Sequence, residues 1–292
     1  MTHVVTLIGP NALDALRRAS AVFARAGEPT LLGPDAADIP FIPVDGMDQR
    51  AAVEALRVAF GTPFDIVLQP TANRRKKLFL ADMDSTMIGQ ECVDELADFV
   101  SLKAHVAAIT ERAMRGEIAF EPALRERVAL LKGLPTRIIG EVIAKRITLT
   151  PGARTLVATM RANGAYTCMV SGGFTLFTQP IAALIDFNES RANTLVLDGT
   201  LLAGSVSEPI FGRARKRATL IELRTRLKLT KDATMATGDG ANDIDMIAEA
   251  GLGIAYHAKP KVAQAAAARI DYADLTALLY VQGYKREEFV AA

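Results

Sequence analysis

Beginning at Leu78, the sequence alternates short apolar runs with longer helix-prone stretches, and this alternation constrains the fold more than any other feature. The apolar runs span residues 78–81, 166–170, 233–237 and 252–256. Strands separated by helices are typical of a parallel sheet, because each return to the starting edge of the sheet needs a crossover. The sequence therefore predicts an α/β fold built on a parallel sheet.

The segment between the first two runs is far longer than a crossover between parallel strands needs. From about Gln90 to Thr148 it is charged, periodic and helix-prone, which predicts a helical subdomain inserted directly after the first strand. At that place the subdomain would cover the end of the strand. Residues 194–202 are apolar on both sides of Asp198-Gly199, and this pattern predicts a β-hairpin.

The first 72 residues predict a separate small α/β domain. Their pattern is β-α-β-α-β, with the elements expected at residues 4–8, 13–23, 41–44, 53–60 and 65–69. The polar, basic stretch 71–77 is expected to be a solvated segment at the domain boundary. Residues 73–292 then form the second domain, with the helical insertion at about residues 90–148.

The composition excludes several classes of protein. Half of the residues are apolar and 23% are charged, which suits a chain with a folded core. The 34 Lys+Arg and 33 Asp+Glu leave a net charge of +1, so global charge does not support a nucleic-acid binder. Two cysteines and three scattered histidines provide neither a disulfide framework nor a zinc or His-rich centre. Because no apolar run approaches the ~18 residues of a membrane span and no signal peptide is evident, we expect a cytoplasmic protein.

Polar residues follow three of the apolar runs, at the point where each run ends. They are Asp82 and Asp84 after the first, Ser171, Gly172 and Gly173 after the second, and Asp239, Asn242 and Asp243 after the third. The carboxyl ends of parallel strands meet at one edge of a sheet, which is where ligands bind in such folds. Carboxylates suit Mg²⁺, whereas a serine, backbone N–H groups and Lys216 suit phosphate oxygens. This edge therefore favours phosphoryl transfer.

In this order, the polar segments resemble the four motifs of the haloacid dehalogenase superfamily: Asp82-Met83-Asp84-Ser85-Thr86, Ser171-Gly172-Gly173, Lys216 and Gly238-Asp239-Gly240-Ala241-Asn242-Asp243. The closer resemblance is to its phosphoserine phosphatase family, through Gly89-Gln90-Glu91, residues 114–120, residues 124–128 and residues 252–260. The similarity extends from about Leu78 to Lys261. It implies a Rossmann-like core with a helical cap inserted after the first strand.

The resemblance implies a role for the carboxylates of the core. Asp82 matches the nucleophile that attacks phosphorus and becomes an aspartyl phosphate. Asp84 matches the acid that protonates the departing oxygen and then the base that activates water. Mg²⁺, the expected cofactor, would be held by the side chains of Asp82 and Asp239 and by the backbone carbonyl of Asp84.

By the same resemblance, Ser171, the Gly172 N–H and Asn242 would hold phosphate oxygens. Lys216 would neutralise charge on the nucleophile and the phosphoryl group, and Asp243 would orient the metal's ligands. Lys216 lies in a basic run, residues 213–217, so the match at this position could shift by one residue.

The cap residues would select the substrate. Glu91 matches the residue that pairs with the substrate ammonium group, and Arg127 matches the one that takes its carboxylate. Arg125, two residues away, is the rival for the second role. Met114 and Phe120 match residues that line the pocket.

The function implied is Mg²⁺-dependent hydrolysis of O-phospho-L-serine to serine and phosphate, the last step of serine biosynthesis. We expect this small substrate as the binding partner and expect no binding to nucleic acid or to a membrane. The sequence leaves open whether the protein forms a homodimer. The N-terminal domain is similar in its β-α-β pattern to the ACT-like extension of some bacterial members.

Two alternative functions stay open. The first is a phosphatase or phosphotransferase for another small substrate, but Glu91 and Arg127 argue against it because this charge pair suits a zwitterion. The second is a regulatory binding protein without catalysis, and the retention of both Asp82 and Asp84 argues against that. A P-type ATPase would need membrane spans that the sequence lacks, and dehalogenase chemistry would not need Asp84.

Overall fold

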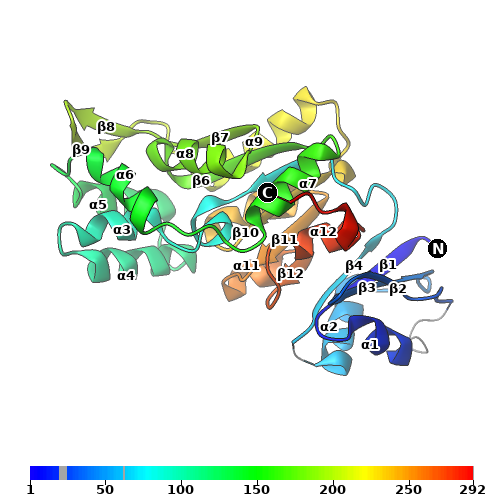
Figure 1. The fold of residues 1–292 in the computed structure, drawn as a ribbon. Coiled ribbons are helices and arrows are strands. Elements are labelled where there is room, and N and C mark those ends of the chain that lie inside the picture. The colour runs from blue at the N-terminus through cyan, green and yellow to red at the C-terminus, as the bar shows by residue number, and fades with distance from the viewer. Residues whose placement is uncertain (20–24, 62, 292) are drawn as a thin grey trace.

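A six-stranded parallel sheet forms the centre of the molecule (Figure 1), with the strand order β12-β11-β10-β5-β6-β7. The structure, a computed structural model, describes residues 1–19, 25–61 and 63–291. The strands are β5 (Leu78–Ala81), β6 (Tyr166–Phe174), β7 (Glu189–Asn193), β10 (Thr234–Gly238), β11 (Leu252–Tyr256) and β12 (Ala268–Ile270). The predicted α/β fold with a parallel sheet is confirmed. The two edge strands β7 and β12 were not predicted, because β7 is polar and half-exposed and β12 has only three residues.

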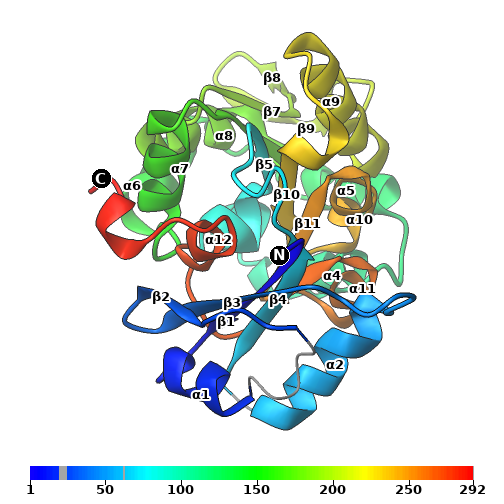
Figure 2. The same ribbon diagram turned by 90° about the vertical axis from the view of Figure 1, so that its right-hand side faces the viewer.

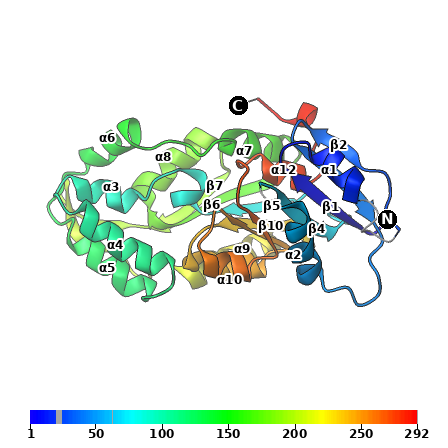
Figure 3. The same cartoon turned by 90° about the horizontal axis from the view of Figure 1, so that it is seen from below.

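Helices cover both faces of this sheet (Figures 2 and 3). One face carries α7 (Ala153–Ala162), α8 (Thr175–Ile185) and α12 (Ala277–Val281), and the other carries α9 (Arg213–Arg226), α10 (Ile244–Glu249) and α11 (Pro260–Ala265). Side chains alternate along a strand, so Leu80 of β5 packs with Leu220 of α9 while Phe79 packs in the cluster that contains Leu156 of α7. Burial on both sides explains why these strands are apolar throughout. Within the described chain, no helix is long and apolar enough to cross a membrane.

Between β5 and β6, four consecutive helices form a separate group at one end of the molecule (Figure 1) and are followed by α7, which returns to the core. They are α3 (Cys92–Asp98), α4 (Lys103–Met114), α5 (Phe120–Ala129) and α6 (Arg137–Lys145). We name residues 90–148, which contain them, the cap. The predicted hairpin is confirmed as β8 (Leu195–Asp198) and β9 (Leu201–Val206), and it packs on the cap, where the Gly133 N–H donates to the Leu202 carbonyl at 2.8 Å.

The cap leaves and rejoins the core through two segments that lie side by side, residues 87–90 and 148–152, which we name the cap stem. The Gly89 N–H donates to the Thr148 carbonyl and the Thr150 N–H donates to the Met87 carbonyl, both at 3.0 Å. The Gln90 side chain makes a reciprocal pair with Thr148, accepting from its N–H at 2.9 Å and donating to its Oγ1 at 2.8 Å. The stem is therefore the place where any movement of the cap must occur.

The N-terminal unit has the order β-α-β-β-α-β, which corrects the predicted β-α-β-α-β. Its elements are β1 (His3–Ile8), α1 (Ala12–Ala19), β2 (Thr30–Gly33), β3 (Ala36–Phe41), α2 (Gln49–Phe60) and β4 (Asp65–Pro70). The antiparallel sheet has the order β2-β3-β1-β4, the split β-α-β arrangement. The strand predicted at residues 41–44 is wrong: β3 ends at Phe41, and Pro43 has no N–H to continue a ladder. The helix predicted at residues 13–23 is confirmed over residues 13–19 as part of α1, and residues 20–23 lie outside the described residues.

Both faces of the N-terminal sheet are buried, one by α1 and α2 and the other by the larger unit (Figure 2). Ile8, Leu32 and Val67 belong to the apolar cluster that contains Leu278 of α12. The expectation of a solvated segment at residues 71–77 is confirmed at residues 71–73, 75 and 77, which are exposed, but it is wrong at Arg74 and Lys76. Arg74 donates to the Asp38 carboxylate and to the Val281 carbonyl, and the Lys76 side chain is only 5% exposed. The two units therefore share one continuous interface.

Candidate active site

The carboxyl edge of the large sheet faces the cap, and the residues predicted for catalysis gather there. β5 ends at Ala81, but the Asp82 N–H still donates to the Thr237 carbonyl of β10 at 3.0 Å, and the backbone is extended at Asp82 (φ −66°, ψ 160°) and Asp84 (φ −64°, ψ 138°). Residues two apart in extended chain point the same way, and both carboxylates line one cavity. The chain reverses direction at Ser85, which has a φ of 54°.

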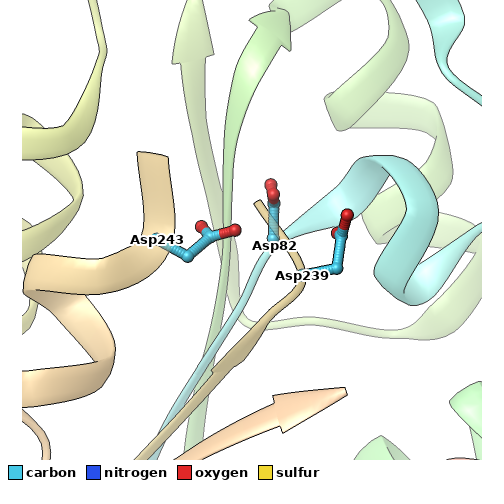
Figure 4. A group of neighbouring side chains, drawn as sticks. All are labelled: Asp82, Asp239 and Asp243. Atoms are coloured by element: carbon cyan, nitrogen blue, oxygen red, sulfur yellow. The ribbon is translucent and has the colours of Figure 1, made fainter. Parts of the chain in front are cut away.

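Three carboxylates converge at this edge: Asp82 after β5, Asp239 after β10, and Asp243 in the short turn that follows (Figure 4). One oxygen from each lies within 4.8 Å of the others. Burial, and then the charge of Asp82, raise the pKa of Asp239 to about 7 and raise the pKa of Asp243 well above its usual value. A crowded group of oxygen donors with surplus negative charge fits Mg²⁺.

Lys216 of α9 supplies the positive charge of this group. Its Nζ lies 2.7 Å from Asp82 Oδ1 and 2.7 Å from Asp243 Oδ1, and its side chain is fully buried. Burial opposes the charged form, but the Asp243 and Asp82 carboxylates outweigh burial and raise the pKa of Lys216. Its basic neighbours Arg215 and Arg217 are exposed. The fold therefore selects Lys216 from the basic run, because one face of α9 turns toward the sheet.

Asp84 occupies the cap side of the site. Its Oδ1 accepts from the Cys92 N–H at 2.8 Å, and its Oδ2 accepts from Ser171 Oγ at 3.1 Å. Ser171 Oγ in turn accepts from the Gly173 N–H at 2.8 Å. Burial, and then the Asp82 charge, raise the pKa of Asp84. The environment of Asp84 therefore favours the protonated acid, which is the form that can give a proton to a leaving group.

Gly172 and Asn242 form a polar hollow beside Asp84. A Cβ on Gly172 would lie 2.6 Å from Phe120 Cζ and 3.2 Å from Asn242 Nδ2, so only glycine leaves room for the facing ring and amide. The Asn242 Oδ1 is buried and has no hydrogen-bond partner among the described residues. Unpaired buried polar atoms are rare and costly in folded proteins, so this amide is positioned for a ligand.

Glu91 and Arg127 approach the site from the cap. Glu91 precedes α3, and its Oε1 accepts from Ser85 Oγ at 2.7 Å. Burial, and then the charges of Asp84 and Asp239, raise the pKa of Glu91 well above its usual value. Arg127 of α5 is 2% exposed; its Nε donates to the Ala123 carbonyl at 3.0 Å and its Nη1 donates to Thr110 Oγ1 at 2.9 Å.

No ion pair among the described residues involves Arg127. Burial of its guanidinium lowers the pKa of this side chain. The rival Arg125 is exposed and forms an ion pair with Glu208 at 2.7 Å, outside the site. The alternative that Arg125 binds the substrate carboxylate is therefore not supported. Arg127 is the guanidinium that faces the cavity, and its charge lacks a carboxylate partner there.

A cavity of about 30 Å³ lies between core and cap. Its lining consists of Asp82, Asp84, Glu91, Val93, Met114, Phe120, Leu124, Arg127, Gly172, Gly173, Phe174 and Asn242. Four residues predicted for the site lie outside this lining: Ser171, Lys216, Asp239 and Asp243. Ser171 and Lys216 contact the lining residues Asp84 and Asp82, respectively. Asp239 and Asp243 belong to the same carboxylate group as Asp82. The volume suits about one water molecule, so entry of a larger substrate requires the cap to move.

Sequence reasoning assigned no role to several residues that support the site. Thr86 Oγ1 donates to Asp239 Oδ1 at 2.8 Å, and Ser85 holds Glu91; their place directly after Asp84 was the available signal. Lys259 donates its N–H to the Asp239 carbonyl at 3.0 Å and its Nζ to Glu111 of the cap at 2.8 Å. Nothing local in the sequence indicates the partners of Lys259.

Residues 79–248, more than half of the chain, match the sequence profile of the haloacid dehalogenase-like hydrolases. The chain belongs to this family. Among the relatives of this hydrolase, a probable phosphoserine phosphatase from Schizosaccharomyces pombe is 38% identical over 296 residues, which cover 99% of this chain and 97% of the relative.

Two solved structures resemble this hydrolase over different spans. A HAD family hydrolase from Salmonella enterica serovar Typhi has a TM-score of 0.84 and 29% identity, and the match covers 96% of this chain and 98% of that one. A phospho-aspartyl intermediate analogue of phosphoserine phosphatase has a TM-score of 0.67 and 36% identity, with 70% and 98% covered. The first match includes the N-terminal unit as well as the hydrolase core, because it covers nearly the whole chain.

Proposed function

We propose that this hydrolase is a Mg²⁺-dependent phosphoserine phosphatase that converts O-phospho-L-serine to serine and phosphate in the cytoplasm, as the last step of serine biosynthesis. One observation carries the proposal: Glu91 and Arg127 of the cap line the same small cavity as Asp82 and Asp84. A half-buried carboxyl group and a buried guanidinium without an ion-pair partner are costly unless a ligand pairs with them. The ammonium and carboxylate groups of phosphoserine supply those partners, and the guanidinium binds a carboxylate in bidentate fashion.

The first chemical step uses both carboxylates of the Asp82-Met83-Asp84 segment. An Asp82 oxygen attacks phosphorus, and the bond from phosphorus to the serine oxygen breaks. Asp84, whose pKa is raised by burial and by the Asp82 charge, carries the proton on Oδ2 and gives it to the departing serine oxygen. The products are serine and an aspartyl phosphate on Asp82. The solved phospho-aspartyl analogue of a phosphoserine phosphatase supports this intermediate by similarity.

The second step regenerates the enzyme. Asp84, now ionised, accepts a proton from water as the water oxygen attacks phosphorus, and the bond between phosphorus and Asp82 breaks. Ser171, the Gly172 N–H and Asn242 hold the phosphoryl oxygens during both steps, because they surround the hollow beside Asp84. Lys216 balances the negative charge on Asp82 through its 2.7 Å contact.

The carboxylates at the sheet edge suit a bound Mg²⁺ ion. Asp82 and Asp239 would hold it with the backbone carbonyl of Asp84, whereas Asp243, already paired with Lys216, would orient the ligands. Bound there, Mg²⁺ would neutralise charge on the phosphoryl oxygens so that they can approach the Asp82 carboxylate.

The test is phosphate release from O-phospho-L-serine and from p-nitrophenyl phosphate, with and without Mg²⁺, for the wild type, Glu91→Gln and Glu141→Gln. Glu141 is a cap residue outside the cavity and serves as the matched control. We expect a strong preference for phosphoserine, a requirement for Mg²⁺, and loss of phosphoserine turnover in Glu91→Gln alone. Turnover of p-nitrophenyl phosphate without turnover of phosphoserine would support the proposed catalytic steps but contradict phosphoserine as the substrate. No release from either ester would favour the regulatory binding protein.

A further inference from the structure

A carboxylate of the N-terminal unit, Asp65 at the start of β4, is buried against the larger unit. It is 1% exposed and accepts backbone N–H groups from Asp271 at 2.6 Å, Tyr272 at 3.3 Å and Ala273 at 2.9 Å. These donors belong to residues 271–276, which connect β12 to α12 and which we name the support loop. Three N–H donors partly offset the cost of burying a carboxylate, and they tie the support loop to Asp65 across the interface.

The support loop contacts the second half of the cap stem. The Leu275 N–H donates to the Pro151 carbonyl at 3.1 Å. At Gly152 a Cβ would lie 2.7 Å from the Thr276 nitrogen, so the two backbones are in direct contact. The loop is also held internally, because Asp274 Oδ1 accepts from the Thr276 N–H at 2.8 Å and from its Oγ1 at 2.5 Å.

The cap stem then reaches the active site. The bonds between Thr150 and Met87 and between Thr148 and Gly89 tie the returning segment to the departing one. Met87 ends the turn that begins after Asp82, and Gly89 lies two residues before Glu91. A continuous series of hydrogen bonds and backbone contacts therefore runs from Asp65 to the stem on which Glu91 is mounted.

We propose that Asp65 is a positioning residue: by fixing the support loop, it sets the resting position of the cap stem and so the fit of the cap over the substrate. The part of this inference that concerns phosphoserine rests on the proposed function, whereas the mechanical coupling does not. The cavity of about 30 Å³ must open to admit substrate, and the stem is the only covalent connection between core and cap. A residue that stabilises one position of the stem therefore changes how readily the cavity between core and cap opens.

The test compares Asp65→Asn with Asp38→Asn. Asparagine keeps the shape of Asp65 but replaces one acceptor oxygen with a donor, which opposes the N–H groups of the support loop. Asp38 is the matched control: it is a buried carboxylate of the same sheet, and it also acts across the interface, through Arg74 and the Val281 carbonyl. Its contacts lead to the end of α12 and not to the cap stem. Hydrogen exchange of residues 148–152, and kcat and KM for phosphoserine and p-nitrophenyl phosphate, are the readouts.

For Asp65→Asn we expect exchange at residues 148–152 to rise about 10-fold, and KM for phosphoserine to rise about 3- to 10-fold with kcat nearly unchanged. Turnover of p-nitrophenyl phosphate stays close to wild type, because its leaving group makes no use of the cap charges. Asp38→Asn lowers the melting temperature but leaves both readouts at wild-type values. Unchanged exchange in Asp65→Asn, or an equal rise in Asp38→Asn, overturns the proposal.

Two further outcomes are separable. If the wild type does not hydrolyse phosphoserine, the proposed function fails, while the exchange comparison still decides the role of Asp65. If Asp65→Asn does not fold, Asp274→Ala loosens the support loop without changing the N-terminal unit, and the same rise in exchange at residues 148–152 is expected. Unchanged exchange in that variant overturns the coupling.

Discussion

The two halves of the site are held in different ways. The core half, with Asp82, Asp239, Asp243 and Lys216, sits at the ends of β5 and β10 and on α9, and its side chains are tied to one another at distances down to 2.7 Å. The cap half presents Glu91 and Arg127 from elements that join the core through the two segments of the stem. The group that would do the chemistry is therefore fixed by the sheet, and the group that would recognise the substrate is mounted on the part that must move.

The electrostatics of the two halves differ as well. The core half has three carboxylates and one lysine, so the proposed Mg²⁺ would balance its surplus negative charge whatever the leaving group of the phosphate ester. The cap half offers a carboxyl group and a guanidinium to the cavity, which suits the ammonium and carboxylate groups of a zwitterion. We therefore expect variants in the core half to lower the turnover of every phosphate ester equally, whereas variants in the cap half should lower the turnover of phosphoserine selectively.

The largest effect is expected for Asp82→Asn, which removes the proposed nucleophile. Turnover of both O-phospho-L-serine and p-nitrophenyl phosphate should fall about 10⁴-fold or more, because both esters would use the same attacking oxygen. Initial rates of phosphate release measure this, with the exposed Asp198→Asn as control. Loss with only one of the two esters would contradict the shared nucleophile.

Arg127→Gln should distinguish the role of the cap half from that of the core half. We expect kcat/KM for phosphoserine to fall about 10²-fold, because the substrate carboxylate would be buried without its charged partner, while p-nitrophenyl phosphate changes less than about 10-fold. The matched control is Arg125→Gln, two residues along α5, whose side chain is exposed and paired with Glu208. Equal losses in the two arginine variants would show that the cap does not read the carboxylate through Arg127.

The pH dependence of stability should reveal the surplus charge of the core half. The pKa of Asp239 is raised to about 7, so between pH ~4 and pH 7 the folded state binds a proton that the unfolded state has released. Without Mg²⁺, the free energy of unfolding should therefore decrease as the pH rises through this window, and Tm should fall by on the order of a few °C.

Mg²⁺ should reverse that trend, because it binds the ionised carboxylates and stabilises the folded state more at pH 8 than at pH 5. Melting curves at both pH values, with Mg²⁺ or with a chelator, measure the effect. Asp239→Asn is the control and should weaken both dependences, because Asp84, Glu91 and Asp243 also have raised pKa values. A Mg²⁺ stabilisation that is equal at the two pH values would argue against these carboxylates as the ligands.

The smallest effect is expected for Glu111→Gln, which breaks the 2.8 Å ion pair between Glu111 of the cap and Lys259 of the core. Both side chains are partly exposed, so KM for phosphoserine should change only about 2- to 3-fold, and the change should disappear in high salt. Steady-state kinetics at low and high ionic strength test this. Glu117→Gln, which affects a contact within the cap, should show no such salt dependence.

Much of the core could be predicted from the sequence, and less of the N-terminal unit. The runs that became β5, β6, β10 and β11 were recognisable because strands buried on both faces are apolar throughout. The hairpin of β2 and β3 was missed, although Gly33-Pro34-Asp35 is typical of a turn, because β2 has only four residues and β3 contains Asp38 and Pro40. Charge alone suggested a solvated stretch at residues 71–77, whereas Arg74 and Lys76 are in fact held by groups of the larger unit.

The sequence by itself determined the four central strands of the sheet, the inserted cap and the polar groups at the strand ends, because strand patterning is local and parallel strands share one carboxyl edge. Only the tertiary structure decided which neighbouring side chains enter the site. It places Arg127 inside and Arg125 outside, selects Lys216 from a basic run, and links Asp65 to the cap stem. The partners in these contacts come from distant parts of the chain, as in the bond between Asp65 and Asp271, and local periodicity carries no information about such pairs.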